Sequence, residues 1–352
     1  MTKAIEDWKV KKYGRMTTEE ELHRRTHPAW PYMYFNPGQA VAPEKVDEVL
    51  KGCIDVHIHG APLGGWLPGR PPMVQTCIEA SEAGMKALVF KDHNTMVNNC
   101  AIIIQDWLER MAKDKKDAGI DFTPVQVFGG ITLNNSVGGM NKRAVEVALD
   151  YGRCKEIWLP SLDAAHQKEA MGLDGGIRVS DCKGTLTQEM MDILDIMAEY
   201  NDNTKGERVV LSACHVSNEE KIDILDYINK KGLDVKVLMD HVSQELTLVT
   251  PEEAKEMIDK GAYLEFAEVS CIPWPGMQDQ IINFDYSFNL IKELIKEKGP
   301  EHCVLITDAG QPGNEPVPGW KMFIKTLLAQ GVTEEQINVM AKETPSMLLG
   351  KI

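Results

Sequence analysis

The chain has 352 residues, of which 43% are hydrophobic, and this length fits one large α/β barrel or two ordinary domains. Its formal net charge of −15 argues against nucleic-acid binding and against attachment to an anionic membrane surface. The first residues lack the apolar core of a signal peptide, and no apolar run approaches the length of a membrane span. We therefore expect a cytoplasmic enzyme that acts on a small molecule.

The eight cysteines are dispersed along the chain, and no two of them form a Cys-x-x-Cys pair. This spacing indicates neither a disulfide framework nor a structural zinc knuckle. We expect reduced and mostly buried thiols.

Residues 1–50 are predicted to form an N-terminal arm that packs on the main domain or on a second subunit of a homo-oligomer. The arm has a capping-box pattern at 17–20 and a segment rich in proline and aromatic residues at 28–35. A short helix over 43–51 leads into the first strand. Residues 51–352 are predicted to form the catalytic domain.

In this domain an apolar strand, a loop and an amphipathic helix alternate along the chain. The first strand lies in the stretch from Cys53 to Gly60. Seven further strand candidates cover 86–91, 123–128, 156–159, 208–214, 235–239, 262–266 and 303–307. Capping boxes at Ser217 and Thr250 begin two of the helices. Apolar residues at helical spacing in 101–111 and 284–295 are typical of core-facing stripes.

Eight repeats of strand and helix favour a (β/α)₈ barrel of the TIM type over a doubly wound sheet. A dinucleotide-binding sheet would carry Gly-x-Gly-x-x-Gly after its first strand, where this chain has His57 and His59. The glycine pairs at 129–130 and 138–139 lack that spacing. A nicotinamide cofactor is therefore not expected.

His57 and His59 end the first strand and share one face of it, because successive side chains on a strand alternate between faces. Two converging imidazoles are a plausible beginning of a zinc, manganese or iron site. A hydrogen-bonded pair of core histidines is the alternative, and this fragment alone favours it.

Ionisable residues also close five other predicted strands. In chain order they are Lys91 and His93, then His215, then Asp240 and His241, then Glu268, and finally Asp308. The interior of a soluble barrel is normally filled by branched apolar side chains, whereas its active site lies at the carboxyl ends of the strands. Coordination of a metal explains so many ionisable strand ends more simply than packing does.

The pair His57 and His59, followed by His215, His241 and Asp308, resembles the metal-binding pattern of the amidohydrolase superfamily of metal-dependent hydrolases. The resemblance runs from about residue 50 to the end of the chain, where 344–350 resembles the closing segment of the family. It implies a barrel that holds one or two divalent ions, zinc first and manganese or iron as alternatives. It also implies hydrolysis of a carbonyl-type bond, such as an amide, cyclic amide, lactone or thioester, without identifying the substrate.

One departure from the family concerns the residue that bridges two metals. Members with a binuclear centre often use a carboxylated lysine from strand four, but residues 158–163 contain no lysine. Lys91 is predicted to take this place as a carboxylated bridge. The alternative is an ammonium group that neutralises a substrate carboxylate or pairs with Glu268, and the sequence does not choose between the two. His93 is predicted to be a further ligand or a hydrogen-bond donor to the substrate carbonyl.

Asp308 is predicted to be the catalytic acid–base residue. Water on a divalent ion has a pKa of about 7 and still needs a carboxylate that orients it and carries its proton. A helix N-cap is the alternative for Asp308, but Gly310, Pro312 and Gly313 follow, and a helix is not expected to start there. The other histidines, at 23, 27, 166 and 302, are predicted to be ordinary surface or loop residues.

Long loops on the catalytic face are expected to act as lids or binding loops. Three of them carry a tryptophan, at positions 66, 274 and 320, which indicates either a partly apolar pocket or loops pinned to the barrel rim. Other chemistry also stays open at this point. The same barrel suits a metal-dependent lyase, decarboxylase or hydratase, a lyase that uses Lys91 as a Schiff-base nucleophile, or a metal-binding scaffold without activity.

Overall fold

A computed structural model of the chain describes residues 40–62, 69–204, 206–274 and 282–352. Most of the predicted N-terminal arm lies outside these residues, as do His23, His27 and Trp66. The helix expected at the end of the arm is present as α3 (Pro43–Leu50), which packs against α13 (Pro316–Ala329).

The described residues contain eight parallel strands that form one sheet in the order of the sequence. They are β1 (Ile54–Ile58), β2 (Ala87–Phe90), β3 (Gln126–Thr132), β4 (Cys154–Trp158), β5 (Val210–Ser212), β6 (Val237–Met239), β7 (Tyr263–Ala267) and β8 (Cys303–Ile306). Backbone hydrogen bonds from Asp308 N to His57 O and from His59 N to Ala309 O join the last strand to the first. The predicted (β/α)₈ barrel is thereby confirmed.

The strand predicted at 123–128 lies further along the chain, at Gln126–Thr132. Pro124 cannot donate to a sheet, so the strand begins after it. The strand also continues through the glycine pair at 129–130. A Cβ on Gly130 would lie only 1.8 Å from Glu156 O of β4. Glycine is required there for β3 and β4 to approach each other.

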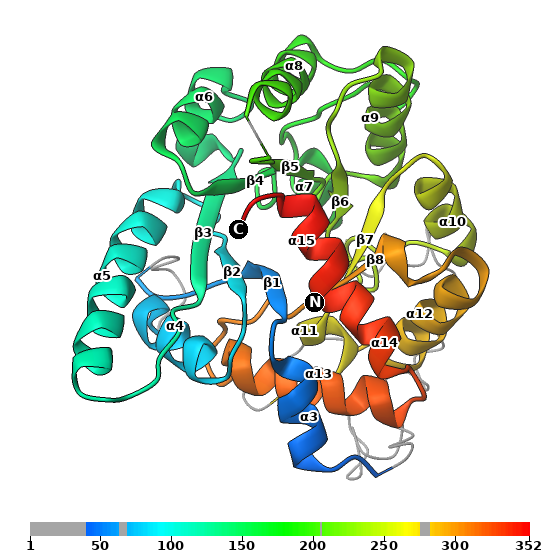
Figure 1. The fold of residues 1–352 in the computed structure, drawn as a ribbon. Helices are drawn as coiled ribbons and strands as arrows, with labels where there is room; N and C mark the ends of the chain where they lie inside the picture. Colours follow the sequence, from blue (N-terminus) through cyan, green and yellow to red (C-terminus); the bar gives the residue numbers. More distant parts are fainter. Residues whose placement is uncertain (1–39, 63–68, 205, 275–281) are drawn as a thin grey trace.

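Helices surround the barrel, as Figure 1 shows. Besides α3 and α13 they are α4 (Met73–Glu82), α5 (Asn98–Asp117), α6 (Lys142–Tyr151), α7 (Ala165–Ala170), α8 (Gln188–Asn203), α9 (Asn218–Lys231), α10 (Pro251–Asp259), α11 (Glu268–Cys271), α12 (Phe284–Lys298), α14 (Glu334–Asn338) and α15 (Thr344–Leu349). The capping boxes predicted at Ser217 and Thr250 are present at the starts of α9 and α10. Among the described residues, no helix has the length and apolar character that a membrane crossing requires.

The amino-terminal end of the barrel is covered by the end of the chain. In Figure 1, α15 crosses in front of the strands. Lys155 of β4 is buried and donates from Nζ to Leu349 O at 2.9 Å and to Lys351 O at 2.7 Å. The carboxyl end of the strands remains as the face on which a site can form.

The core is built as the sequence pattern predicted. In α5, Ala101, Ile104 and Leu108 are buried. In α12, Phe288 and Ile291 are buried. The cysteines, all of which lie in the described residues, are free, and six of the eight are buried. The expected reduced thiols are therefore consistent with the fold.

Candidate metal centre

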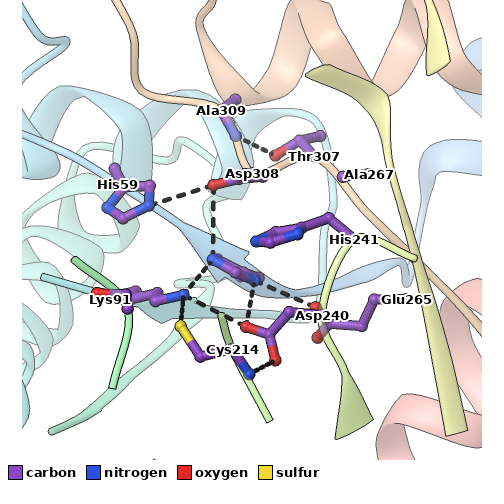
Figure 2. Close-up of polar contacts among 12 residues, drawn as sticks. His59, Lys91, Cys214, Asp240, His241, Glu265, Ala267, Thr307, Asp308 and Ala309 are labelled. Carbon is purple, nitrogen blue, oxygen red and sulfur yellow. Dashed lines mark hydrogen bonds and ion pairs between the residues drawn. The ribbon is translucent and has the colours of Figure 1, made fainter. Parts of the chain in front are cut away.

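Two imidazole nitrogens and a carboxylate oxygen meet where β1 and β8 end. Asp308 Oδ1 lies 3.2 Å from His59 Nε2 and 3.5 Å from His57 Nε2. All three residues are buried, and they form one of two groups among the described residues whose ligand atoms lie within 4.8 Å of one another. Figure 2 shows His59 and Asp308 facing each other. The structure thus brings together three of the predicted ligands.

Backbone strain is concentrated at the ends of the strands that carry the site. Cys214, His241 and Asp308 have φ angles of 49°, 32° and 52°. Residues with side chains seldom adopt this left-handed region, and such outliers are typical of functional sites. Gly310 has φ of 118°, and a Cβ on it would come within 2.3 Å of His59 O. The loop after β8 can therefore lie directly on the end of β1.

Five imidazoles form a continuous row across the mouth of the barrel, which we call the histidine row. It consists of His93, His59, His57, His241 and His215. Neighbouring ring centroids are 5.1 Å apart for the first pair, then 5.7 Å, 5.8 Å and 5.2 Å. The structure therefore places all five predicted histidines at one site.

Three members of the row are held by neutral partners through Nδ1. His93 Nδ1 lies 2.8 Å from Ser161 Oγ, His215 Nδ1 lies 2.8 Å from Gln167 Oε1, and His241 Nδ1 lies 2.8 Å from Thr247 Oγ1. Such partners fix the ring orientation of histidines that bind metals. For His215 and His241, this contact leaves Nε2 as the nitrogen that can bind an ion.

Lys91 lies beneath the histidine row and is buried. Its Nζ is 3.1 Å from His57 Nε2. It is also 3.1 Å from Cys214 Sγ and 3.3 Å from Asp240 Oδ2, and Figure 2 shows these two contacts. Burial lowers the pKa of the Lys91 ammonium, but Cys214, Asp240 and Asp308 raise it above its ordinary value.

The alternative in which Lys91 pairs with Glu268 is wrong, because the carboxylate beside Lys91 belongs to Asp240. Glu268 instead accepts a hydrogen bond from Asn314 Nδ2 at 3.2 Å. The strand ends could not show this, since β6 lies opposite β2 in the barrel and Lys91 reaches Asp240 across the interior.

The protonation state of the histidine row suits a metal. Burial lowers the pKa of all five imidazoles, and it lowers that of His241 to about 4. Neutral imidazole is the form that binds metal ions, and nitrogen with carboxylate oxygen is a donor set that zinc, manganese and iron accept. The residues present therefore fit a divalent ion.

The barrel interior under the row holds four carboxyl groups, which we call the interior carboxyls. They are Asp55, Glu156, Asp240 and Glu265, and each is fully buried. Glu265 Oε2 lies 3.2 Å from His57 Nδ1. Asp55, Glu156 and Glu265 are not among the predicted site residues, although the alternation of faces that pairs His57 with His59 also puts Asp55 on that face.

Two outer predictions are corrected by the structure, and one is confirmed. Trp320 does not lie in a rim loop but within α13, where its Nε1 donates to Asp55 Oδ2 at 2.6 Å. His166 is not a surface residue, because it is buried in α7 with its Nε2 3.0 Å from Leu246 O. Asp308 is not an N-cap, since α13 begins at Pro316. The exclusion of a helix start at Asp308 is thus confirmed.

Comparison with known proteins gives a family and a fold. A family model described as "Family of unknown function (DUF6282)" matches residues 52–265. No curated protein matches the chain. Among solved structures, the organophosphorus hydrolase from Deinococcus radiodurans is 14% identical, with 89% of this chain and 96% of that chain covered and a TM-score of 0.55.

A mutant of a PTE-like lactonase from Deinococcus radiodurans is 15% identical, with 89% of this chain and 100% of that chain covered and a TM-score of 0.55. A structure described as the engineering of organophosphate hydrolysis from a weak promiscuous lactonase template is also 15% identical, with the same coverage and a TM-score of 0.54. At this identity the likeness shows the fold alone. It confirms the barrel that the resemblance to the amidohydrolase superfamily implied.

Proposed function

The chain belongs to the family of unknown function DUF6282, and we propose that it is a metal-dependent hydrolase that cleaves a carbonyl-type bond in a small molecule. The observation that carries the proposal is the meeting of His57 Nε2, His59 Nε2 and Asp308 Oδ1 at the carboxyl end of the barrel. In barrel enzymes this end holds the active site.

The first ion would be held by His57, His59 and Asp308. A second ion, if present, would be held by His215 and His241, whose rings lie 5.2 Å apart. A divalent ion in such a site supplies Lewis acidity and lowers the pKa of a water molecule to about 7. Zinc is our first choice, because it accepts imidazole and carboxylate ligands in open catalytic sites.

Asp308 has the position that proton transfer requires. Its Oδ1 is within 3.5 Å of the Nε2 atoms of both His57 and His59, and the loop that follows it is held against β1. A carboxylate fixed in this way can take a proton from the attacking water and pass it to the leaving group. His93, with its ring 5.1 Å from that of His59, would donate to the substrate carbonyl or complete the ligand set.

Lys91 is open to two roles, and its contacts support the ammonium form. A carbamate on Nζ would place a second anion beside the Asp240 carboxylate, which is 3.3 Å from Nζ. An ammonium group instead compensates this buried charge. The same contacts argue against a Schiff base, because attack on a carbonyl requires a neutral amine. If Lys91 were carboxylated and bridged two ions, Lys91→Ala would lose one metal per chain.

Lactones are the substrate class that we propose to test first. The lactone is a carbonyl-type bond, and a lactonase is named among the structures with the same fold. Amides, thioesters and organophosphate esters complete the panel, since an organophosphorus hydrolase is also among them. The protein partner that we propose is a second copy of this chain in a homo-oligomer.

Metal analysis of protein purified without chelators, combined with assays on this panel, tests the proposal. We expect one to two zinc, manganese or iron ions per chain and a hydrolysis that stops after chelation and returns with the added metal. Hydrolysis by metal-free protein would contradict the proposal. Product mass separates the lyase alternative, because hydrolysis adds one water to the substrate and a lyase reaction does not.

A further inference from the structure

His57 presents its two ring nitrogens to two different groups. Its Nε2 faces His59 and Asp308 at the mouth of the barrel. Its Nδ1 faces the interior, 3.2 Å from Glu265 Oε2 and 3.7 Å from Asp240 Oδ2. Either group has ligand types and spacing that a metal site could use. His57 therefore stands between two candidate sites.

The chemistry of imidazole allows only one of these groups to take an ion through His57. A neutral ring has one nitrogen that donates a proton and one that carries a lone pair. The mouth supplies a second imidazole and opens at the strand ends, where barrel enzymes bind their substrates. The interior supplies carboxyl groups, and the oxygen nearest His57, Glu265 Oε2, can accept the proton that Nδ1 donates. The lone pair is thus assigned to Nε2 and the proton to Nδ1.

We infer that Glu265 is a positioning residue that accepts the Nδ1–H of His57 and so turns the lone pair of Nε2 toward the metal. The inference rests on the proposed function, since it concerns the same ion. Glu265 is carried by β7, on the side of His57 away from the barrel mouth. Carboxylates in this relation to a metal-binding histidine fix its tautomer and raise its basicity.

Lys91 favours the same tautomer from the other side. Its Nζ lies 3.1 Å from His57 Nε2, and an ammonium group can only donate. The nitrogen that receives this hydrogen bond must carry the lone pair. In the metal-free protein, the carboxyl group at Nδ1 and the ammonium at Nε2 therefore specify the same tautomer of His57, and an ion that binds Nε2 takes this lone pair from the Lys91 hydrogen bond.

A purely structural role explains Glu265 less well. The side chain is fully buried, and among the described residues its Oε1 has no hydrogen-bond partner. Burying a carboxyl group with so few partners costs free energy of folding. If Glu265 served only packing, an uncharged side chain of the same size would stabilise the fold more. The unfolding midpoint of Glu265→Gln therefore shows whether the glutamate contributes to stability.

The experiment compares Co²⁺ binding by full-length metal-free protein in three forms: wild type, Glu265→Gln and Glu156→Gln. Glu156 is a matched control, because it is an equally buried glutamate of the barrel interior and has no hydrogen bond to His57 among the described residues. Affinity is measured by competition with a chromogenic chelator, and the ligand field of Co²⁺ is followed by its visible absorption. We expect Glu265→Gln to weaken binding by about 10–100-fold and to change the spectrum, and Glu156→Gln to do neither.

Urea unfolding of the metal-free proteins separates positioning from structure. We expect the midpoint for Glu265→Gln to equal or exceed that of the wild type. Equal Co²⁺ affinity in wild type and Glu265→Gln would overturn the inference. An equal loss of Co²⁺ affinity in Glu265→Gln and Glu156→Gln would also overturn it. Wild-type protein that binds no Co²⁺ would instead overturn the proposed function, and this role with it.

A measurement on the wild type alone covers the case in which Glu265→Gln does not fold. Nitrogen chemical shifts of ¹⁵N-labelled histidine report which ring nitrogen carries the proton, and the signals of His57 are those lost in His57→Asn. We expect Nδ1 to be protonated in the metal-free protein. Protonation at Nε2 would overturn the inference.

Discussion

The mouth and the interior of this barrel hold histidine in different ways. At the mouth, the Nδ1 atoms of His93, His215 and His241 meet a hydroxyl, an amide and another hydroxyl. At the boundary with the interior, the Nδ1 of His57 meets the carboxylate of Glu265. A neutral partner fixes the direction of a ring, whereas a carboxylate also strengthens the ring as a ligand.

The difference predicts an order of binding. The ion at His57, His59 and Asp308 has the ligand with the charged partner, so it should bind more tightly than an ion at His215 and His241. Of the interior carboxyls, Glu265 and Asp240 then act on the site through His57 and Lys91. Substitutions at the mouth should abolish metal binding or turnover, and substitutions in the interior should change affinity or stability.

The largest expected effect is that of His59→Asn. This substitution removes a ligand of the first ion, so metal content should fall by one ion per chain and turnover should fall to that of metal-free protein. Elemental analysis and the hydrolysis assay measure both. His302→Asn is the control, because His302 lies in the turn before β8 and its Nδ1 contacts Ala262 O at 2.9 Å. Retention of the full metal content by His59→Asn would contradict the assignment of the site.

Asp308→Asn should reduce turnover by about 10²–10⁴-fold, the contribution typical of a proton-transferring side chain. The amide keeps the size of the side chain but cannot take the proton. Steady-state kinetics with saturating metal measure the effect. A loss below about tenfold would mean that another residue moves the proton.

Lys91→Met should lower the free energy of unfolding by about 3–5 kcal/mol, because it leaves the buried Asp240 carboxylate without its cation. Urea denaturation of the metal-free variant measures this loss. Unchanged stability would show that Asp240 does not depend on Lys91, and would reopen the carbamate assignment.

Asp55→Asn tests an interior carboxyl that does not face His57 Nδ1. The carboxylate accepts hydrogen bonds from Thr307 Oγ1 at 2.5 Å and from Trp320 Nε1 at 2.6 Å. Replacing one oxygen by an amide NH₂ should cost about 1–3 kcal/mol of unfolding free energy, since the nitrogen cannot accept the hydrogen bonds of the oxygen that it replaces. The Co²⁺ affinity should stay within the range of the wild type. A loss of affinity as large as that of Glu265→Gln would remove the distinction between the interior carboxyls.

The smallest effect is expected far from both regions, at the start of α14. Thr333 caps this helix by accepting a hydrogen bond from Gln336 N at 3.3 Å. Thr333→Ala should cost about 1 kcal/mol in thermal or urea unfolding and leave turnover unchanged. A change in turnover would show that stability and activity are coupled across the barrel.

The barrel and its mouth were predictable from the sequence for local reasons. Strands alternate with helices along the chain, and the polar residues at the strand ends stand out against apolar runs. The candidate site at His57, His59 and Asp308 could therefore be predicted before the strands were placed in space.

The interior was not predictable in the same way. A single glutamate within an apolar strand, such as Glu156 or Glu265, looks like an interruption of the strand until the neighbouring strands are known. The partner of Lys91 depends on which strand ends lie closest across the barrel, and spacing along the chain does not encode this. The shift of β3 depends on contact between Gly130 and the backbone of β4, which is likewise a property of the assembled sheet.

The central claim is that an ion binds on the Nε2 side of His57. Anomalous diffraction from crystals grown with zinc tests this directly. We expect the strongest peak within bonding distance, about 2.0–2.2 Å, of His57 Nε2, His59 Nε2 and Asp308 Oδ1. A strongest peak at His57 Nδ1, between Asp240 and Glu265, or no peak at the barrel mouth, would contradict it.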